Sequence, residues 1–130
     1  MSTRQPFRFK STGIAAPLLR ISTARTPGGA EVVRLDGEVD QDQRVRLQRA
    51  LDRAVGDRPQ LLVVDLSGLA FCDSTCLNVL LSARAAAQAA GVELVLAALS
   101  SQARRLLEIT GTDEVFTVRD SVRAALAGNG

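Results

Sequence analysis

The sequence contains no histidine, tryptophan or tyrosine, and its 130 residues include only two cysteines and four phenylalanines. Without histidine, the chain lacks the most common general base at neutral pH and the usual nitrogen ligand of zinc sites. Serine or cysteine nucleophiles that depend on a histidine partner are excluded for the same reason. Because aromatic residues are scarce, the core must be built from aliphatic side chains. For the same reason few rings are available to stack on nucleic-acid bases, so binding by base stacking is disfavoured.

Long apolar runs are also missing. No run approaches the roughly 20 residues that a membrane span needs, and the N-terminal segment MSTRQPFRFKSTG lacks the hydrophobic stretch of a signal peptide. We therefore expect a cytoplasmic protein with no membrane contact. Thiols stay reduced in that compartment, so Cys72 and Cys76 are not expected to form a structural disulfide. One thiol pair without histidine is too small a ligand set for zinc, and neither a metal nor another cofactor is expected.

Acidic residues are absent from the first 25 positions, which hold five of the 16 basic residues. The rest of the chain therefore carries 11 basic and 14 acidic residues and has no basic stripe, so direct nucleic-acid binding is not expected. Residues 1–14 mix Pro, Gly, Ser, Thr and basic side chains without apolar periodicity. We expect a flexible basic arm there, followed by a single domain over residues 15–130.

Apolar periodicity predicts strands and helices in the order β-β-α-β-α-β-α-β-α. The expected elements are strands 17–25 and 31–37, helix 40–56, strand 61–66, helix 75–90, strand 92–98, helix 102–110, strand 114–118 and helix 121–127. Strands that alternate with helices indicate parallel pairing with helical cover. The predicted fold class is therefore α/β, with a single mixed, largely parallel sheet, an N-terminal antiparallel hairpin and about four covering helices.

Turn residues set the expected boundaries of these elements. Pro27 and Gly28 fit the second and third positions of a type II turn in the opening hairpin. Gly56, Gly91 and Gly111 stand where the C-terminal caps of three helices are expected.

The segment FCDST lies in a predicted loop, residues 67–75, before helix 75–90. In open sheets, binding sites gather where strands end and helices begin. Asp73 or Ser74 is expected to cap this helix. The flanking cysteines, Cys72 and Cys76, are expected to be small buried apolar residues of the core. A phosphate-binding loop is disfavoured, because Gly68 is the only glycine in the turn and no lysine begins the helix.

Several chemical interpretations of this loop remain open. Cys76 is a candidate nucleophile at a helix N-terminus, and Asp40, Asp65 and Asp73 are candidate carboxylates of a small enzyme. The plainer interpretation makes Asp65 a turn former at a strand end and Asp40 a loop residue or helix cap. A further interpretation is that Ser74 is an exposed hydroxyl on which another enzyme acts. A deep pocket near these groups would favour an enzyme, and a shallow surface a docking module.

Two motifs resemble a known family. VVDLSGLAFCDSTCLNVLL, residues 63–81, and LDGEVDQ, residues 35–41, are similar to the two signature segments of the STAS domain of bacterial anti-sigma factor antagonists. The similarity extends over about residues 17–127. It implies a STAS-like fold and no catalytic residue of the chain's own. One position differs, because Cys76 stands where the family usually has glycine.

The resemblance also implies a switch. In the family, an anti-sigma factor that is also a serine kinase phosphorylates the serine after the motif aspartate, which here is Ser74. The unphosphorylated protein binds the anti-sigma factor and frees a sigma factor, the phosphorylated protein releases it, and a phosphatase resets the cycle. Asp73 matches the aspartate beside the acceptor, and Asp40 matches the aspartate of the other motif.

These matches predict one partner-binding edge on the domain. Its expected residues are Asp40, Asp73, Ser74, Thr75, Asn78 and Ser82. Thr75, Asn78 and Ser82 are spaced three to four residues apart, opposite the leucine face of their helix. The alternatives are a STAS scaffold that is never phosphorylated, in a signalling or lipid-transport assembly, and the small enzyme described above. The oligomeric state is left open between a monomer and a weak dimer.

Overall fold

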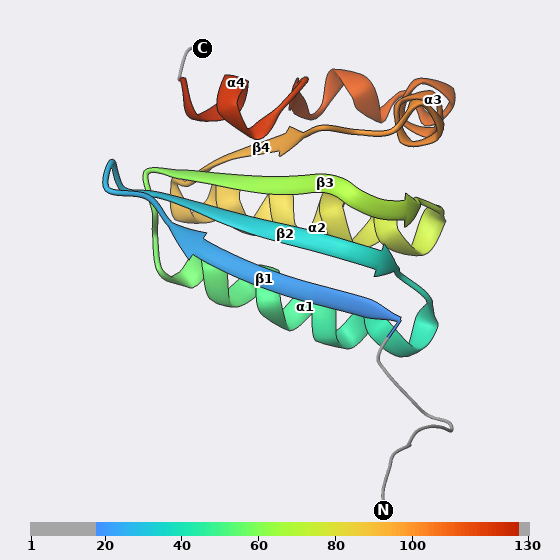
Figure 1. Cartoon of the computed structure of the whole chain (residues 1–130), viewed down its shortest axis with the longest axis horizontal. Coiled ribbons are helices and arrows are strands. Elements are labelled where there is room, and N and C mark those ends of the chain that lie inside the picture. The colour runs from blue at the N-terminus through green and yellow to red at the C-terminus, as the bar shows by residue number, and fades with distance from the viewer. Residues whose placement is uncertain (1–17, 128–130) are drawn as a thin grey trace, which may run out of the picture.

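The computed structural model describes residues 18–127, in which five strands form one sheet in the order β1-β2-β3-β4-β5 (Figure 1). The strands are β1 Leu19–Arg25, β2 Ala30–Glu38, β3 Leu61–Phe71, β4 Glu93–Ala97 and β5 Thr117–Arg119. The helices of this part are α1 Gln41–Gly56, α2 Ser74–Ala90, α3 Ser101–Thr110 and α4 Val122–Leu126, with a 3-10 turn, η1, at Thr112–Glu114. β1 is antiparallel to β2 and all other neighbouring strands are parallel. The predicted fold class and element order are confirmed, whereas the predicted arm, residues 1–14, lies outside the described residues.

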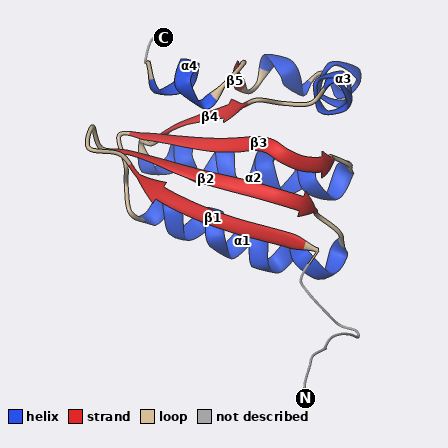
Figure 2. Ribbon diagram, viewed as in Figure 1, coloured by secondary structure: helices blue, strands red, loops and turns tan. Residues whose placement is uncertain are grey.

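The two faces of the sheet are covered unequally (Figure 2). Helices α1, α2 and α3 contribute Leu51, Leu80 and Leu107 to a large core with the strand residues Leu35 and Val64. This aliphatic core is the one that the scarcity of aromatic residues predicted.

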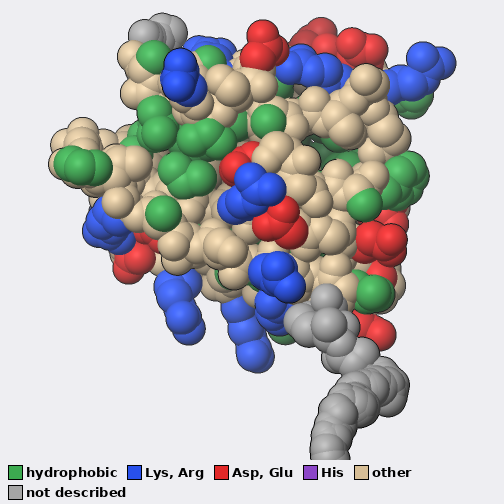
Figure 3. Space-filling model, in the orientation of Figure 1, with side chains coloured by type: hydrophobic (Ala, Val, Ile, Leu, Met, Phe, Trp, Pro, Cys, Tyr) green, Lys and Arg blue, Asp and Glu red, His purple; other side chains and the backbone are tan. Residues whose placement is uncertain are grey.

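The opposite face carries a much smaller apolar cluster. It consists of Val63, Val95, Ala97 and Ala125, the last of which belongs to α4. Charged and polar side chains gather over the rest of this face, which is turned toward the viewer in Figure 3. Since side chains alternate along a strand, β3 is buried on both faces near Val63.

β3 is longer than the sequence pattern predicted. Its pairing with β4 ends at Asp65, but the strand continues beside β2 until Phe71, so the predicted loop over 67–75 is wrong for residues 67–71. Two register shifts between β2 and β3 accommodate the additional residues of β3. Gly68 lies at the first shift, and a side chain there would overlap the Asp36 carboxylate. The extension carries the end of β3 directly to the start of α2.

Two turns differ from the expectation. In the β1-β2 hairpin the left-handed residue is Gly29, with φ 90°, and Gly28 does not have a positive φ, so the predicted type II turn is wrong. Gly56 is the last residue of α1 and not a left-handed cap. Arg58 adopts the positive φ instead, at 52°, just before Pro59. Residue type alone did not show which neighbour would take the strained conformation.

The other helix ends follow the local chemistry of the sequence. Gly91 and Gly111 adopt φ values of 73° and 77° at the ends of α2 and α3, as predicted. Ser100 caps α3 by accepting a 3.1 Å hydrogen bond from the amide of Ala103. The last strand is shorter than predicted over 114–118, because the amides of Val115 and Phe116 bond back to the Thr112 carbonyl. Within the described part, no helix is both long and apolar enough to cross a membrane.

Candidate functional site

Two aspartates begin two neighbouring helices at the carboxyl ends of β2 and β3. Asp40 caps α1 by accepting a hydrogen bond from the amide of Gln43 at 3.1 Å. Asp73 caps α2 by accepting one from the amide of Cys76 at 3.2 Å. Each carboxylate therefore satisfies a free N–H group and places negative charge at the positive end of a helix dipole. The cap of α2 is Asp73 and not Ser74, and Asp40 has the capping role that the plainer interpretation gave it.

Ser74 is the first residue of α2 and is exposed. Within residues 18–127, its hydroxyl forms no hydrogen bond to another side chain or to the backbone. Thr75 differs, because it is half-buried and its hydroxyl accepts a 3.2 Å hydrogen bond from the side-chain amide of Gln41. The two adjacent hydroxyls thus differ in exposure and in hydrogen bonding.

The remaining predicted partner-binding residues lie further along α2. Asn78 and Ser82 are exposed, whereas Leu77 and Leu80 point into the core. At a rise of about 1.5 Å per residue, Ser82 lies roughly 12 Å from Ser74 along the helix. The structure therefore places the predicted residues at two adjacent helix starts and along one exposed side of α2.

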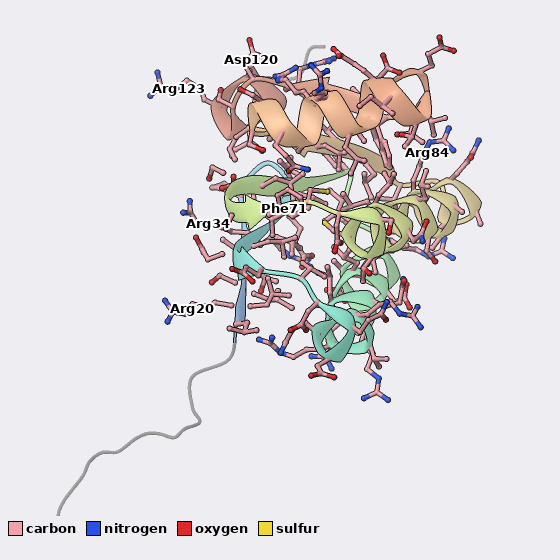
Figure 4. The ribbon with its side chains drawn as sticks, turned by 90° about the vertical axis from the view of Figure 1, so that its right-hand side faces the viewer. Arg20, Arg34, Phe71, Arg84, Asp120 and Arg123 are labelled. Atoms are coloured by element: carbon pink, nitrogen blue, oxygen red, sulfur yellow. The ribbon has the colours of Figure 1, made fainter. Side chains whose placement is uncertain are left out.

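Phe71 adds a residue that sequence reasoning did not include in the site. It is the last residue of β3, and 55% of its surface is exposed. Figure 4 views the molecule from the end to which β2 and β3 point, where Phe71 is labelled. Its position three residues before Ser74 places this exposed ring at the same end of the sheet as the start of α2. Only the structure distinguishes it from a core phenylalanine.

Both cysteines are buried behind the first turn of α2, with 2% of Cys72 and none of Cys76 exposed. They are free thiols, and they fill the core as the packing interpretation predicted. A hydrogen bond with the Cys72 thiol, together with burial, raises the pKa of Cys76 well above its ordinary value. The same hydrogen bond lowers the pKa of Cys72, because Cys76 can donate to its thiolate. A buried thiol that resists ionisation is poorly suited to act as a nucleophile, which disfavours that role for Cys76.

Gln102 contacts the loop from a distant part of the chain. Its side-chain oxygen accepts a 2.9 Å hydrogen bond from the amide of Cys72, and its side-chain nitrogen donates to the Cys72 carbonyl at 2.5 Å. Gln102 is the second residue of α3, 30 positions away in sequence. No motif in the sequence indicated this contact.

Asp65 does not join the other two candidate carboxylates. It is buried within β3 between Val64 and Leu66, which face the large core, so its side chain points to the opposite face of the sheet. There it accepts a 3.0 Å hydrogen bond from the amide of Ser67 and lies 3.5 Å from the guanidinium of Arg34. The turn-like bond to Ser67 matches the plainer interpretation, although Asp65 lies inside the strand and not at its end.

Arg34 organises a charged group on the open sheet face. Its guanidinium donates to the Asp36 carboxylate at 2.9–3.2 Å and to the Ser67 hydroxyl at 3.2 Å. The hydrogen bonds from Arg34 lower the pKa of Asp36, and those to Asp36 raise the pKa of Arg34. Arg34 and Phe71 are both labelled in Figure 4. The mutual pairing of these charges accounts for their presence on this face.

Four of the surface grooves that residues 18–127 form have volumes between 210 and 470 Å³. They lie between α2 and β5, between α3 and β5, beside the β1-β2 hairpin, and between α1 and β1. Their linings do not include Asp40, Asp65, Asp73 or Cys76. Nor do any three His, Cys, Asp or Glu side chains of residues 18–127 come together as a set that could hold a metal ion.

The domain has one sheet with a hairpin at its edge, three helices on one face, and two helices capped by aspartates at one end. This arrangement defines a STAS-like α/β domain. The STAS domain family matches residues 22–125. The chain belongs to this family, as its two motifs predicted.

Several known proteins with similar sequences or structures are anti-sigma factor antagonists by name. The anti-sigma-F factor antagonist RsfB of Mycobacterium tuberculosis is 30% identical over 115 residues, which cover 88% of this chain and 93% of RsfB. The crystal structure of an anti-sigma factor antagonist from Mycobacterium paratuberculosis has a TM-score of 0.75 at 26% identity, and covers 88% of this chain and 97% of its own. The Bacillus protein SpoIIAA in its phosphorylated form shares the fold, with a TM-score of 0.66 at 16% identity over 83% of this chain and 97% of its own.

Proposed function

We propose that this protein is an anti-sigma factor antagonist whose binding is switched off by phosphorylation of Ser74. The observation that carries the proposal is the contrast at the start of α2. Ser74 is exposed with a free hydroxyl, whereas the Thr75 hydroxyl beside it is half-buried and bonded to Gln41. A kinase that reaches this helix start therefore meets Ser74 first.

The partner in this proposal is an anti-sigma factor with serine kinase activity. The names of RsfB and of the M. paratuberculosis protein support an anti-sigma factor as the partner class. SpoIIAA, which shares the fold, has been solved in a phosphorylated form, so the fold accepts a phosphate in that protein. A phosphatase that removes the phosphate completes the cycle.

The proposed binding surface consists of the predicted edge together with Phe71. Its members are Asp40, Phe71, Asp73, Ser74, Thr75, Asn78 and Ser82. Phe71 contributes exposed apolar area and the others are small or polar. Interfaces typically combine an apolar anchor of this kind with a polar surround.

In the phosphorylation step, the Ser74 hydroxyl oxygen attacks the γ-phosphorus of ATP. A bond forms between this oxygen and phosphorus, the bond to the ADP oxygen breaks, and the hydroxyl proton passes to a base of the kinase. The chain's own contribution is to present the hydroxyl, since no basic group of residues 18–127 bonds to it. Catalysis is thereby assigned to the partner.

The phosphate disrupts binding through its charge. It adds about −1.5 to −2 charges at neutral pH. These charges would lie beside the Asp73 and Asp40 carboxylates, in a contact that forms around an uncharged hydroxyl. A repulsion and desolvation cost of about 2.7 kcal/mol corresponds to a hundredfold loss of affinity, and burial of an uncompensated charge can cost more than that.

The direct test is phosphate mapping by mass spectrometry. Wild-type protein and the Ser74→Ala and Thr75→Val variants are incubated with ATP and candidate anti-sigma factor kinases. We expect one phosphate on Ser74 in wild type and in Thr75→Val, and none in Ser74→Ala. Phosphate on Thr75 alone would show that the acceptor is Thr75 and not Ser74. Binding without any phosphate would favour the unmodified STAS scaffold.

A further inference from the structure

We propose that Gln102 is a positioning residue for phosphorylation, which holds the Ser74 loop in place by acting as a substitute for a missing strand. This inference rests on the proposed function of Ser74. It extends that function to a residue in α3, which neither the signature motifs nor the exposed surface of α2 includes.

The need for such a residue arises from the unequal lengths of β3 and β4. Pairing between them ends at Asp65 and Ala97. β3 nevertheless continues to Phe71 with β2 as its partner on one side. The chain after β4 turns into α3, so Gln102 approaches the loop from the side that β4 has left. Both backbone polar groups of Cys72 then bond to the Gln102 side chain.

A glutamine side chain is chemically suited to this position. Its amide carries a donor and an acceptor in one plane, as a peptide group of a neighbouring strand does. The acceptor meets the Cys72 amide and the donor meets the Cys72 carbonyl. Glutamate would keep the first bond and place a second acceptor against the carbonyl. Methionine has a similar length and would lose both bonds.

The contact controls Ser74 because only Asp73 lies between it and Cys72. Asp73 is the α2 cap, and its carboxylate bonds to the amide of Cys76 in the next turn. Cys72 itself is buried, so loss of the Gln102 bonds leaves two backbone groups without partners and favours a shift of the loop toward water. A displacement of about 1 Å at a reacting group can slow a positioned reaction about a hundredfold. The expected effect is therefore on the rate of phosphoryl transfer.

The test compares Gln102→Met and Gln102→Glu with wild type, using ATP and an anti-sigma factor kinase that phosphorylates the wild-type protein. We expect kcat for Ser74 phosphorylation to fall at least tenfold in both variants, while KM for this protein stays within threefold. Hydrogen exchange at the Cys72 amide should accelerate at least tenfold. Gln88→Met and Gln88→Glu are the matched controls, because Gln88 is an exposed glutamine near the far end of α2 whose side chain accepts from Arg84. They should leave kcat and the exchange rate unchanged.

Separate outcomes would overturn the inference and the proposed function. If wild type is phosphorylated and both Gln102 variants keep kcat within twofold, the inference is wrong and the proposed function stands. If kcat falls only in proportion to the folded fraction measured by circular dichroism, Gln102 is structural and the positioning role is wrong. If wild type takes no phosphate on Ser74 from any candidate kinase, the proposed function fails and the inference fails with it.

Discussion

The side-chain amide of Gln41 donates a hydrogen bond to the Thr75 hydroxyl at 3.2 Å and joins the first turn of α1 to the first turn of α2. The two residues belong to different sequence motifs, 34 positions apart. The bond links the two helix starts, and it engages the Thr75 hydroxyl while that of Ser74 stays free.

The first prediction concerns the charge state of residue 74. Ser74→Ala should bind the anti-sigma factor in the presence of ATP as tightly as wild type does without ATP, because it cannot accept phosphate. Ser74→Asp should bind at least tenfold more weakly, because it places a permanent charge beside Asp73. Titration calorimetry measures both affinities, and circular dichroism should show an unchanged fold. Equal affinities for the two variants would contradict a charge-based switch.

A second prediction tests the exposed side of α2. The double variant Asn78→Arg and Ser82→Arg should reduce binding by at least a hundredfold, since two long cations replace small side chains in the proposed contact. Ala89→Arg is the control, because Ala89 is exposed near the opposite end of the same helix. Both proteins should unfold near the wild-type temperature. Wild-type affinity in the double variant would place the interface elsewhere.

The third prediction concerns the caps. Asp73→Ala removes the acceptor for the Cys76 amide and should lower the free energy of unfolding by about 1 kcal/mol. Asp73→Ser keeps a capping oxygen without the charge and should recover most of that loss. Urea unfolding measures both changes. If Asp73→Ser were as unstable as Asp73→Ala, charge and not hydrogen bonding would be the source of the stabilisation.

Alkaline pH provides a fourth prediction, because the pKa of Cys76 is raised by its hydrogen bond with Cys72 and by burial. The unfolded chain ionises this thiol near pH 8.5, so above that pH the unfolded state loses a proton that the folded state keeps. The free energy of unfolding should therefore fall by about 1.4 kcal/mol per pH unit. The lowered pKa of Cys72 acts in the opposite direction and raises the free energy of unfolding as the pH approaches about 8.5, so the loss due to Cys76 is expected at higher pH.

Few other groups titrate in this pH range, since the chain has no tyrosine or histidine and a single lysine. Urea unfolding between pH 7.5 and 10 under reducing conditions measures the slope. The double variant Cys72→Ala and Cys76→Ala should remove it. A slope that persists in the double variant would assign the alkaline loss of stability to other groups.

Local chemistry made much of this fold predictable. Gly91 and Gly111 end helices as predicted, because a left-handed cap depends mainly on neighbouring backbone groups, whereas the same prediction was wrong for Gly56. The α/β order follows from apolar periodicity in the same way. Asp73 and Ser74 could be placed at the start of α2 from the motif, although the choice of Asp73 as the cap required the structure.

Contacts between distant segments were not predictable. The extension of β3 to Phe71 depends on pairing with β2 across two register shifts, which no local pattern encodes. The bonds from Gln102 to Cys72 depend on where β4 ends. In the sequence alone, Gln102 cannot be distinguished from any other polar residue at the start of a helix. For the same reason, the hydrogen bond between Gln41 and Thr75 could not be predicted from the sequence.

The two buried thiols can serve as an internal probe of opening at the start of α2. Cys72 and Cys76 lie directly behind the turn that carries Ser74, and both are almost completely shielded from solvent. A thiol reagent can reach them when this turn opens or when the whole domain unfolds, so labelling faster than global unfolding reports how often the turn leaves its native position. Any event that tightens or loosens the start of α2 can be followed by counting labelled sulfurs over time, without a tag and without knowledge of the partner.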